Sequence, residues 1–186
     1  MFKKLVKEKM KTCNSIEDYA QIKKLLEEYG IEKFRQEMED MKIFKRLEQE
    51  EGQIQINPEN NPFAQMLFGK YQNQFEEMER DFILIDSDAN LTHKFLVPKI
   101  LDWNCFNVLT LTEKHLPLLK QMKALAFLYA FENRIRKFGL FFHCYPFNTV
   151  HMLHLHIVDL NVESQFLNKT NNLKVDDVIT YLETLS

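Results

Sequence analysis

The sequence is poor in the residues that mark several protein classes. Only three cysteines, Cys13, Cys105 and Cys144, occur in 186 residues, and none forms a Cys-x-x-Cys pair. This argues against a disulfide framework and against a cysteine-ligated zinc site, and it is typical of a reducing compartment. No run of about 18 apolar residues is present, so no membrane span is predicted. We therefore expect a cytoplasmic protein without a membrane partner.

The sequence also lacks an excess of basic residues. Its formal net charge is -3 and its pI is about 6.1, so broad electrostatic attraction to nucleic acid or to an anionic membrane is not favoured. The basic start, MFKKLVKEKMK, has no long apolar core, lacks Arg and Ser, and contains Glu8. These features argue against a secretory signal and a mitochondrial presequence.

The apolar content is sufficient for a buried core. Hydrophobic residues make up 45% of the chain and aromatic residues 12%. The length of 186 residues suggests one domain, or one domain with an appendage. The appendage is residues 1–56, a charged arm of helical character. One helix follows Ser15 as its cap and ends at Gly30, and a second extends over 31–51. Each has one apolar seam, which either packs on the rest of the protein or binds a partner.

The polar, proline-bounded segment NPENNP, residues 57–62, is the best domain boundary in the chain. Residues 63–186 form the second predicted domain. The elements expected there are, in order, strands at 80–86 and 92–99, a helix at 112–138 capped by Thr112 and stopped by Gly139, strands at 139–145 and 152–158, and a terminal helix at 175–185. This order predicts an α+β fold, in which an antiparallel sheet has a long helix packed on one face.

Three of the six histidines fall within PFNTVHMLHLHIV, residues 146–158. Alternate residues of a strand share a face, so His154 and His156 would stand about 7 Å apart on one side. Met152 would share that side, whereas His151 has the wrong parity for it. The opposite side would be purely apolar and would consist of Leu153, Leu155 and Ile157.

Three interpretations of the histidine pair are open. The pair is structural, or it ligates zinc, or it performs nucleophilic chemistry. Because no obvious third ligand is nearby, no metal is expected, and no other cofactor either. A neutral imidazole can attack phosphorus to give a phosphoramidate that water hydrolyses, and a second imidazole can stabilise or protonate the phosphate group. The hydroxyl of Thr149, in the preceding turn, could also donate to the phosphate.

The histidine segment resembles the signature of the histidine triad (HIT) superfamily of nucleotide hydrolases and transferases, which is His-x-His-x-His followed by two apolar residues. Met152, His154 and His156 stand at the triad positions. Three longer segments resemble the Hint and aprataxin-like branch: MLFGKY (66–71), FILIDSDANLTHKFLVPK (82–99) and FFHCYPFNTVHMLHLH (141–156). The similarity covers about residues 63–186. It implies a HIT-like antiparallel sheet with a long packed helix, preceded here by the helical arm.

The resemblance also implies roles for individual residues. His154 would be the nucleophile that accepts the nucleotidyl group, and His156 would contact the phosphate. Thr149 would replace a phosphate-binding Ser, and Asp86 would bind the ribose hydroxyls. The other nucleotide-binding candidates are Asn148, the supporting His93, and an apolar base slot of Leu67, Phe68, Tyr71 and Leu84; His143 and His151 are additional candidates.

Each assignment has a structural alternative, and the site departs from the family pattern twice. Asp86 suits a hairpin turn in any fold, Thr149 can cap a turn, and the slot residues would be core residues elsewhere. Met152 replaces the first histidine, which in the family helps to order the nucleophile. The loop from Asp86 to His93 is one residue shorter than the commonest Hint pattern.

Two functional hypotheses follow. The first is an enzyme, a nucleotide hydrolase or nucleotidyl transferase that works through a nucleotidyl-histidine. Its substrate would be a nucleoside phosphoramidate, a (di)nucleoside polyphosphate, an adenylylated end or a cap-like nucleotide. The second is a HIT-fold module without turnover, which serves as a nucleotide sensor or as a structural subunit that docks through its N-terminal arm. The expected ligand is a purine nucleotide, and nucleic acid is not expected. A homodimer or protein complex would form through helix 112–138 or through the arm.

Overall fold

The computed structural model describes residues 1–47, 53–68, 75–87, 90–165 and 169–186. The arm begins with three helices, α1 (Phe2–Lys9), α2 (Ile16–Tyr29) and α3 (Ile31–Asp40). As expected, Ser15 caps α2, because its hydroxyl accepts a hydrogen bond from the Asp18 backbone N–H. Gly30 ends this helix with a φ of 96°. Strands β1 (Phe44–Arg46) and β2 (Ile54–Ile56) then pair antiparallel.

A six-stranded antiparallel sheet forms the centre of the fold. Its strands are β3 (Phe75–Met78), β4 (Phe82–Ser87), β5 (Asn90–Pro98), β6 (Phe138–Phe142), β7 (Leu155–Asp159) and β8 (Leu173–Lys174). Their order is β3-β4-β5-β7-β6-β8, and every neighbouring pair is antiparallel. Strand β7, which carries the predicted site, therefore has a hydrogen-bonded neighbour on each side. The α+β class is confirmed.

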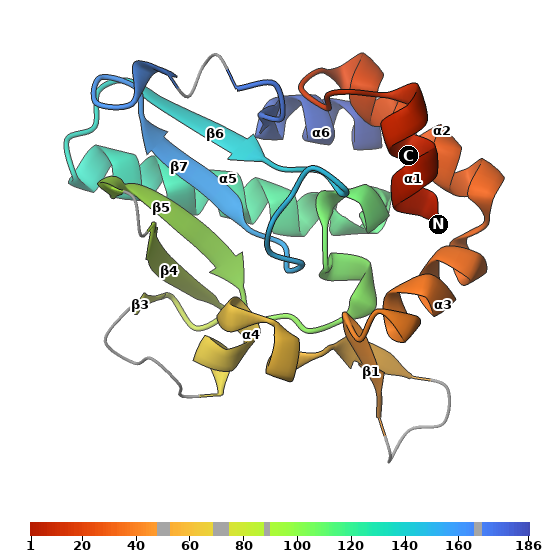
Figure 1. Cartoon of the computed structure of the whole chain (residues 1–186). Coiled ribbons are helices and arrows are strands. Elements are labelled where there is room, and N and C mark those ends of the chain that lie inside the picture. Colours follow the sequence, from red (N-terminus) through yellow and green to blue (C-terminus); the bar gives the residue numbers. More distant parts are fainter. Residues whose placement is uncertain (48–52, 69–74, 88–89, 166–168) are drawn as a thin grey trace.

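Two helices cover one face of this sheet. Figure 1 shows α5 (Leu116–Glu132) running behind β5, β7 and β6, with α1, α2 and α3 gathered at one end of the molecule. The terminal helix α6 (Val175–Glu183), predicted from the sequence, packs on α5, β6 and α2. The shorter helices are η1 (Pro58–Asn60), α4 (Pro62–Leu67), η3 (Trp103–Cys105), η4 (Val108–Thr110) and η5 (Glu113–His115). Among the described residues, no helix has the length and apolar character to cross a membrane.

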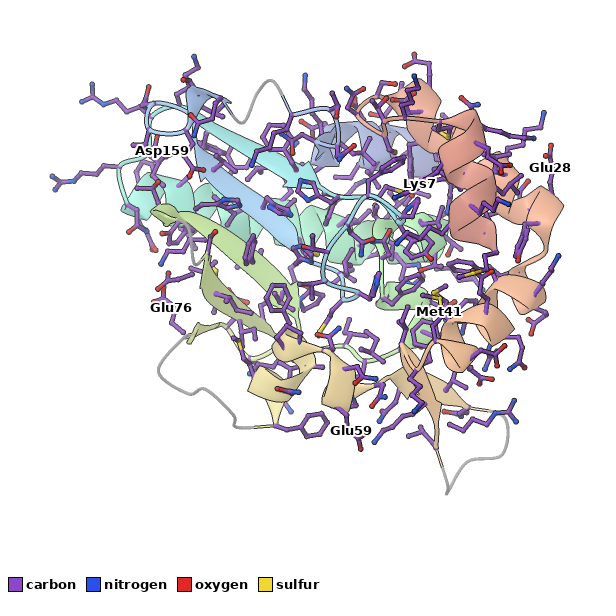
Figure 2. The ribbon with its side chains drawn as sticks, viewed as in Figure 1. Lys7, Glu28, Met41, Glu59, Glu76 and Asp159 are labelled. Carbon is purple, nitrogen blue, oxygen red and sulfur yellow. The ribbon has the colours of Figure 1, made fainter. Side chains whose placement is uncertain are left out.

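The apolar seam of the arm packs on the rest of the chain, which is one of the two alternatives that the sequence allowed. Buried residues of α1, α2 and α3 belong to the same hydrophobic cluster as the sheet and α5. The hydroxyl of Tyr19 donates to the carbonyl of Val108 at 2.8 Å, and its ring meets that of Tyr181 in α6. The arm presents its charged side outward, as Glu28 does in Figure 2.

The predicted helix over 31–51 is wrong for the described residues after Asp40, and its last part, 48–51, lies outside the described residues. Lys42 has a φ of 57°, and the backbone N–H of Ile43 donates back to the Met38 carbonyl at 3.0 Å, which is a common way to end a helix. The chain then enters β1, where Phe44 is buried with its ring 5.1 Å from that of Phe106. Burial of this aromatic ring outweighs the helical preference of a charged stretch.

The predicted helix over 112–138 is too long at both ends. Thr112 caps a short 3₁₀ turn together with His115, whose Nδ1 accepts from the Thr112 backbone N–H at 3.0 Å, and the α-helix starts one residue later. The helix ends at Glu132, before Arg134 takes a φ of 57°. Gly139 is therefore not its stop. It lies in β6, where the ring of Phe141 occupies the space that a Cβ would need.

The two histidine-region strands are also shorter than predicted. The strand expected at 139–145 is β6, which ends at Phe142, and the strand expected at 152–158 is β7, which starts only at Leu155. Residues 143–154 form the connection between them, with a cis Tyr145–Pro146 peptide bond. His154 therefore lies immediately before the strand rather than within it.

Segment 57–62 is structured by its own asparagines. Asn57 caps η1 by accepting from the Glu59 backbone N–H, and Asn61 caps α4 by accepting from that of Ala64. Asn61 also donates to the carbonyl of His151 at 3.0 Å. The segment that enters the second half of the chain is thus hydrogen-bonded to the connection that leads into β7.

Candidate functional site

Four histidine side chains, which we call the histidine cluster, gather around His156. The ring centroid of His156 lies 4.1 Å from that of His143, 4.9 Å from that of His154 and 5.2 Å from that of His93. His93 comes from β5, His156 from β7, and the other two from the ends of the connection between β6 and β7. The sheet therefore assembles four imidazoles from three separate parts of the sequence.

The cluster occupies the face of the sheet opposite α5. His156 pairs with Phe95 of β5, so both side chains point to the same side. The next pair, Ile157 and Lys94, points to the other side, and Lys94 there interacts electrostatically with Tyr129 of α5. The predicted alternation, with Leu155 and Ile157 on one face and His156 and Val158 on the other, is confirmed for the residues within β7.

His154 is held by a backbone carbonyl. Its Nδ1 lies 2.7 Å from the oxygen of Met152, and a carbonyl can only accept, so Nδ1 carries the proton. In the neutral ring, Nε2 then keeps its lone pair. The orientation comes from the main chain at position 152, and the Met152 side chain is buried in the main hydrophobic cluster. The hydrogen bond that orients His154 is therefore present although the first histidine of the triad is replaced by Met152.

His156 and His143 are also fixed by ring-nitrogen contacts. Nδ1 of His156 lies 3.0 Å from Nε2 of His93. Nε2 of His143 lies 2.9 Å from the side-chain oxygen of Asn172, which assigns the His143 proton to that nitrogen. Every imidazole of the cluster therefore has at least one ring nitrogen in a hydrogen bond that limits its rotation.

Burial lowers the pKa of all four imidazoles. For His93 and His154 the pKa falls from 6.5 to about 4, with desolvation as the largest cause. For His156 it falls well below the usual value, first through burial and then through the neighbouring histidines. The pKa of His143 is lowered by burial, although the hydrogen bond to Asn172 opposes this. The cluster is therefore neutral near pH 7, the form in which an imidazole acts as nucleophile or base.

Aromatic rings surround the nucleophile candidate. The centroids of Phe63, in α4, and Phe95 lie 5.1 and 5.4 Å from that of His154, both in edge-to-face geometry. Phe95 also contacts His93 and His156 at 5.0 Å each. These rings exclude water from the imidazoles, which explains why desolvation is the largest cause of each lowered pKa.

The structure does not bring Asp86 or Leu84 to this face. Asp86 pairs with Lys94 across β4 and β5 and forms an ion pair with it, and Leu84 pairs with Leu96. Both therefore point toward the α5 side of the sheet, away from the histidines. The strand register does not support their predicted roles in binding ribose and base beside the cluster.

The turn residues before β7 make contacts other than those that hold the histidine cluster together. Thr149 is exposed. The amide nitrogen of Asn148 donates to the carbonyl of Val150 and lies within hydrogen-bond distance of Nδ1 of His151. His151 packs its ring against Tyr145 at 5.6 Å, and burial lowers its pKa. His151 is therefore part of the connection rather than a substitute for the missing triad histidine.

The predicted base slot falls at the end of α4. Leu67 is half-buried against the main hydrophobic cluster, and Phe68 is 61% exposed. Tyr71 lies outside the described residues. Among the residues that the structure does describe, no group of three or more His, Cys, Asp or Glu side chains is arranged to hold a metal ion.

Five residues near the cluster were not predicted from the sequence: Phe63, Phe95, Glu163, Lys169 and Asn172. Phe95 could have been found, because it has the same strand parity as His93. Glu163 and Lys169 follow β7, where no local pattern marks them. Oε2 of Glu163 lies 3.6 Å from Nδ1 of His93, and the charge of Lys169 lowers the pKa of three cluster histidines.

Comparison with known families agrees with this geometry. Residues 69–171 match the family described as "Scavenger mRNA decapping enzyme C-term binding". The match spans more than half of the chain and includes all four cluster histidines, whereas α1, α2 and α3 lie outside it. A comparison with curated proteins found no match. The chain therefore belongs to the scavenger mRNA decapping enzyme C-term binding family, a HIT-type nucleotide-binding or hydrolase fold, and the predicted membership of the histidine triad superfamily is confirmed.

Proposed function

We propose that this protein hydrolyses a nucleoside polyphosphate through a nucleotidyl-histidine intermediate on His154. The observation that carries the proposal is the 2.7 Å hydrogen bond from His154 Nδ1 to the Met152 carbonyl. It leaves Nε2 as the lone-pair nitrogen of a neutral imidazole. A positioned neutral nitrogen with a lone pair is what nucleophilic attack on phosphorus requires, and three further imidazoles lie beside it.

In the first step, Nε2 of His154 attacks the phosphorus of a nucleotidyl group. A nitrogen–phosphorus bond forms, and the bond from phosphorus to the leaving oxygen breaks, with the electron pair going to that oxygen. The ring is now positively charged, because Nδ1 still carries its proton. The Met152 carbonyl stabilises that charge by accepting the Nδ1 hydrogen bond, so the side chain at position 152 takes no part in the step.

In the second step, water attacks the phosphorus and the nitrogen–phosphorus bond breaks. The bonding electrons return to His154 Nε2, the water loses one proton, and a nucleoside monophosphate is released. Because Nδ1 is protonated throughout, the departing imidazole is neutral, which makes it a good leaving group.

The substrate that we propose is a 5′–5′ linked, cap-type dinucleotide polyphosphate. The description of the matching family names mRNA decapping, and such a substrate supplies a nucleoside diphosphate as leaving group. That leaving group needs no added proton at neutral pH, which suits a site whose histidines are neutral. An adenosine phosphoramidate, whose leaving amine must gain a proton, would then be the poorer substrate.

The alternative is a nucleotide-binding module without turnover. Its supporting observation is the burial of the nucleophile candidate, since His154 is only 6% exposed. The companion idea, that the arm docks the chain onto another protein by its apolar seam, has lost support, because that seam is buried within the chain itself.

The proposed function is tested by incubating the purified chain with a cap-type dinucleotide and, separately, with an adenosine phosphoramidate. We expect nucleoside monophosphate from the first and less from the second, with none from His154→Ala. A substrate labelled on the transferred phosphorus should leave an acid-labile label on the protein during turnover. Nucleotide binding without any product, in a folded protein, would overturn the enzyme proposal and establish the alternative.

We also propose a second copy of the chain as the partner of α5. Phe127, Leu128 and Phe131 are 49%, 46% and 82% exposed on that helix, which is a substantial apolar surface. Light scattering of the purified protein should give the mass of a dimer, and Phe131→Glu should shift it to that of a monomer. A monomeric wild-type protein would contradict this assignment.

A further inference from the structure

The turn after β7 carries a carboxylate to the histidine cluster. β7 ends at Asp159, and the backbone N–H groups of Val162 and Glu163 fold back onto the Asp159 carbonyl at 3.2 and 2.8 Å. Figure 2 shows Asp159 at the end of the molecule opposite Glu28, so this turn is remote from the arm. The turn directs the carboxylate of Glu163 at β5, where its Oε2 lies 3.6 Å from Nδ1 of His93.

Both groups of this pair are buried. Glu163 is 9% exposed and His93 is 6% exposed, so their electrostatic interaction is less screened than that of a surface pair. The distance of 3.6 Å is within ion-pair range and slightly longer than a hydrogen bond. Glu163 raises the pKa of His93 against the larger effect of desolvation. The carboxylate therefore favours a proton on the nitrogen that faces it, which is Nδ1.

The contact between His93 and His156 transmits this preference. Nε2 of His93 and Nδ1 of His156 are 3.0 Å apart, so one donates and the other accepts. A neutral imidazole has a single N–H. If that proton is on Nδ1 of His93, Nε2 of His93 must accept and Nδ1 of His156 must donate. Nε2 of His156 is then left with a lone pair.

We propose that Glu163 is a positioning residue that, through His93, keeps Nε2 of His156 unprotonated and able to accept a proton from the attacking water. The inference rests on the proposed function, because the step it serves is hydrolysis of the nucleotidyl group on His154. Oxygen of water bonds to phosphorus, its proton moves to Nε2 of His156, and the electrons of the nitrogen–phosphorus bond return to His154. The charge gained by His156 is stabilised through His93 by the carboxylate of Glu163.

The reverse proton arrangement places two acceptors face to face. Nδ1 of His93 would then point a lone pair at the carboxylate, and Nε2 of His156 would carry the proton and could not act as a base. The other charged or titratable groups that act on these rings are Lys169, His143 and His154, and each of them, like His93 itself, lowers the pKa of His156. The carboxylate of Glu163 opposes them by raising the pKa of His93.

The deciding experiment is nitrogen NMR of the full-length protein labelled with ¹⁵N, at pH 7.5. Long-range ¹⁵N–¹H correlations report which ring nitrogen of each histidine is protonated, and His93→Asn and His156→Asn variants assign the signals. We expect Nδ1–H for both residues in the wild type. In Glu163→Gln we expect a shift of His156 toward the Nε2–H form, because an amide can either donate or accept. Glu163→Asp, which keeps the charge, should retain most of the wild-type pattern.

Kinetics give the second readout. With the cap-type dinucleotide, Glu163→Gln should lower kcat by roughly 10- to 100-fold with little change in KM, and it should alter the pH profile of kcat. The matched control is Glu132→Gln, since Glu132 is an exposed carboxylate at the end of α5. We expect this control to change neither the kinetics nor the spectra.

The outcomes separate this inference from the proposed function. Nε2–H on His156 in the wild type would overturn the inference without any variant, and so would an unchanged His156 spectrum in a folded Glu163→Gln protein. A tautomer change in a protein that converts no nucleotide would support the positioning by Glu163 and overturn the proposed function instead.

Discussion

Both faces of β7 are buried, but burial has opposite consequences for the side chains on the two faces. Leu155 is fully buried and His156 is 5% exposed. On the α5 side, removing apolar surface from water stabilises the fold. On the other side, removing imidazoles from water costs free energy whenever they are charged, and it lowers their pKa. Burial alone therefore does not distinguish core from site; the chemistry of the buried group and its hydrogen bonds do.

The largest expected effect is the loss of turnover in His154→Ala. Without an acceptor nitrogen, no nucleotidyl-histidine can form, so we expect kcat for the cap-type dinucleotide to fall by at least ~10³-fold. The urea midpoint at pH 7.5 should also fall, because the buried ring packs edge-to-face against Phe63 and Phe95, so turnover is compared per folded molecule. Retained turnover would place the nucleophile elsewhere in the cluster.

The neighbouring substitution, Leu155→Ala, should lower stability and leave turnover nearly intact. It leaves a cavity on the α5 side, for which a loss of about 2–5 kcal/mol in the free energy of unfolding is expected. Turnover by the folded fraction at low temperature should remain within a few-fold of wild type. Denaturant titration measures the first effect and initial rates the second. If folded Leu155→Ala lost turnover as His154→Ala does, the functional division between the two faces would not hold.

Acid should destabilise the histidine face selectively. The folded-state pKa of His154 is about 4 against 6.5 for an unperturbed histidine, so the unfolded chain binds a proton more tightly. The contribution of neutral His154 to the free energy of unfolding is then fully present above about pH 6.5 and is lost as the pH drops toward 4. At pH 5 this residue alone removes about 2 kcal/mol, and His93 acts in the same direction. Urea midpoints at pH 7.5 and 5.0 measure the loss, which should be smaller in His154→Ala; a flat pH dependence would contradict the lowered pKa.

The smallest expected effect is that of Met152→His, which restores the first triad histidine. The atom that holds His154 is the carbonyl of residue 152, which every amino acid has. We therefore expect kcat to change by less than about 3-fold if orientation of the nucleophile is the need at this position. A gain of 100-fold or more would show that the missing side chain, rather than the main chain, limits the site. A loss of stability in this variant would reflect the buried position of Met152.

Features that depend on local pattern could be predicted from the sequence. The strand at 92–99, the capped helix after Ser15 and the terminal helix all follow from periodicity and capping, which are local. The prediction of a helix over 31–51 failed where Phe44 makes an aromatic contact with Phe106, a residue distant from it in the sequence. Burial of Phe44 in the tertiary structure therefore determines the backbone here, and a local stretch of sequence does not reveal such a distant partner.

The histidines of the site could be predicted from the sequence, whereas the residues that surround them could not. His154 and His156 were found because they stand two residues apart in one short motif, whereas the meeting of His93 and His143 with them depends on the order of strands in the sheet. Asp86 was assigned to the site by resemblance, and the register of β4 on β5 turns it to the α5 side. Glu163 reaches His93 only because the turn after β7 folds back, a geometry that its neighbours in sequence do not reveal.

The hydrogen bond to the Met152 carbonyl has a consequence for evolution and for sequence searching. Where a main-chain atom performs a task, selection on the side chain at that position is relaxed, and the residue can drift to suit the packing beneath it. A search that demands three histidines in alternation would pass over such a chain. A search that asks for the last two histidines of the motif, together with a third on the neighbouring strand, would recover it.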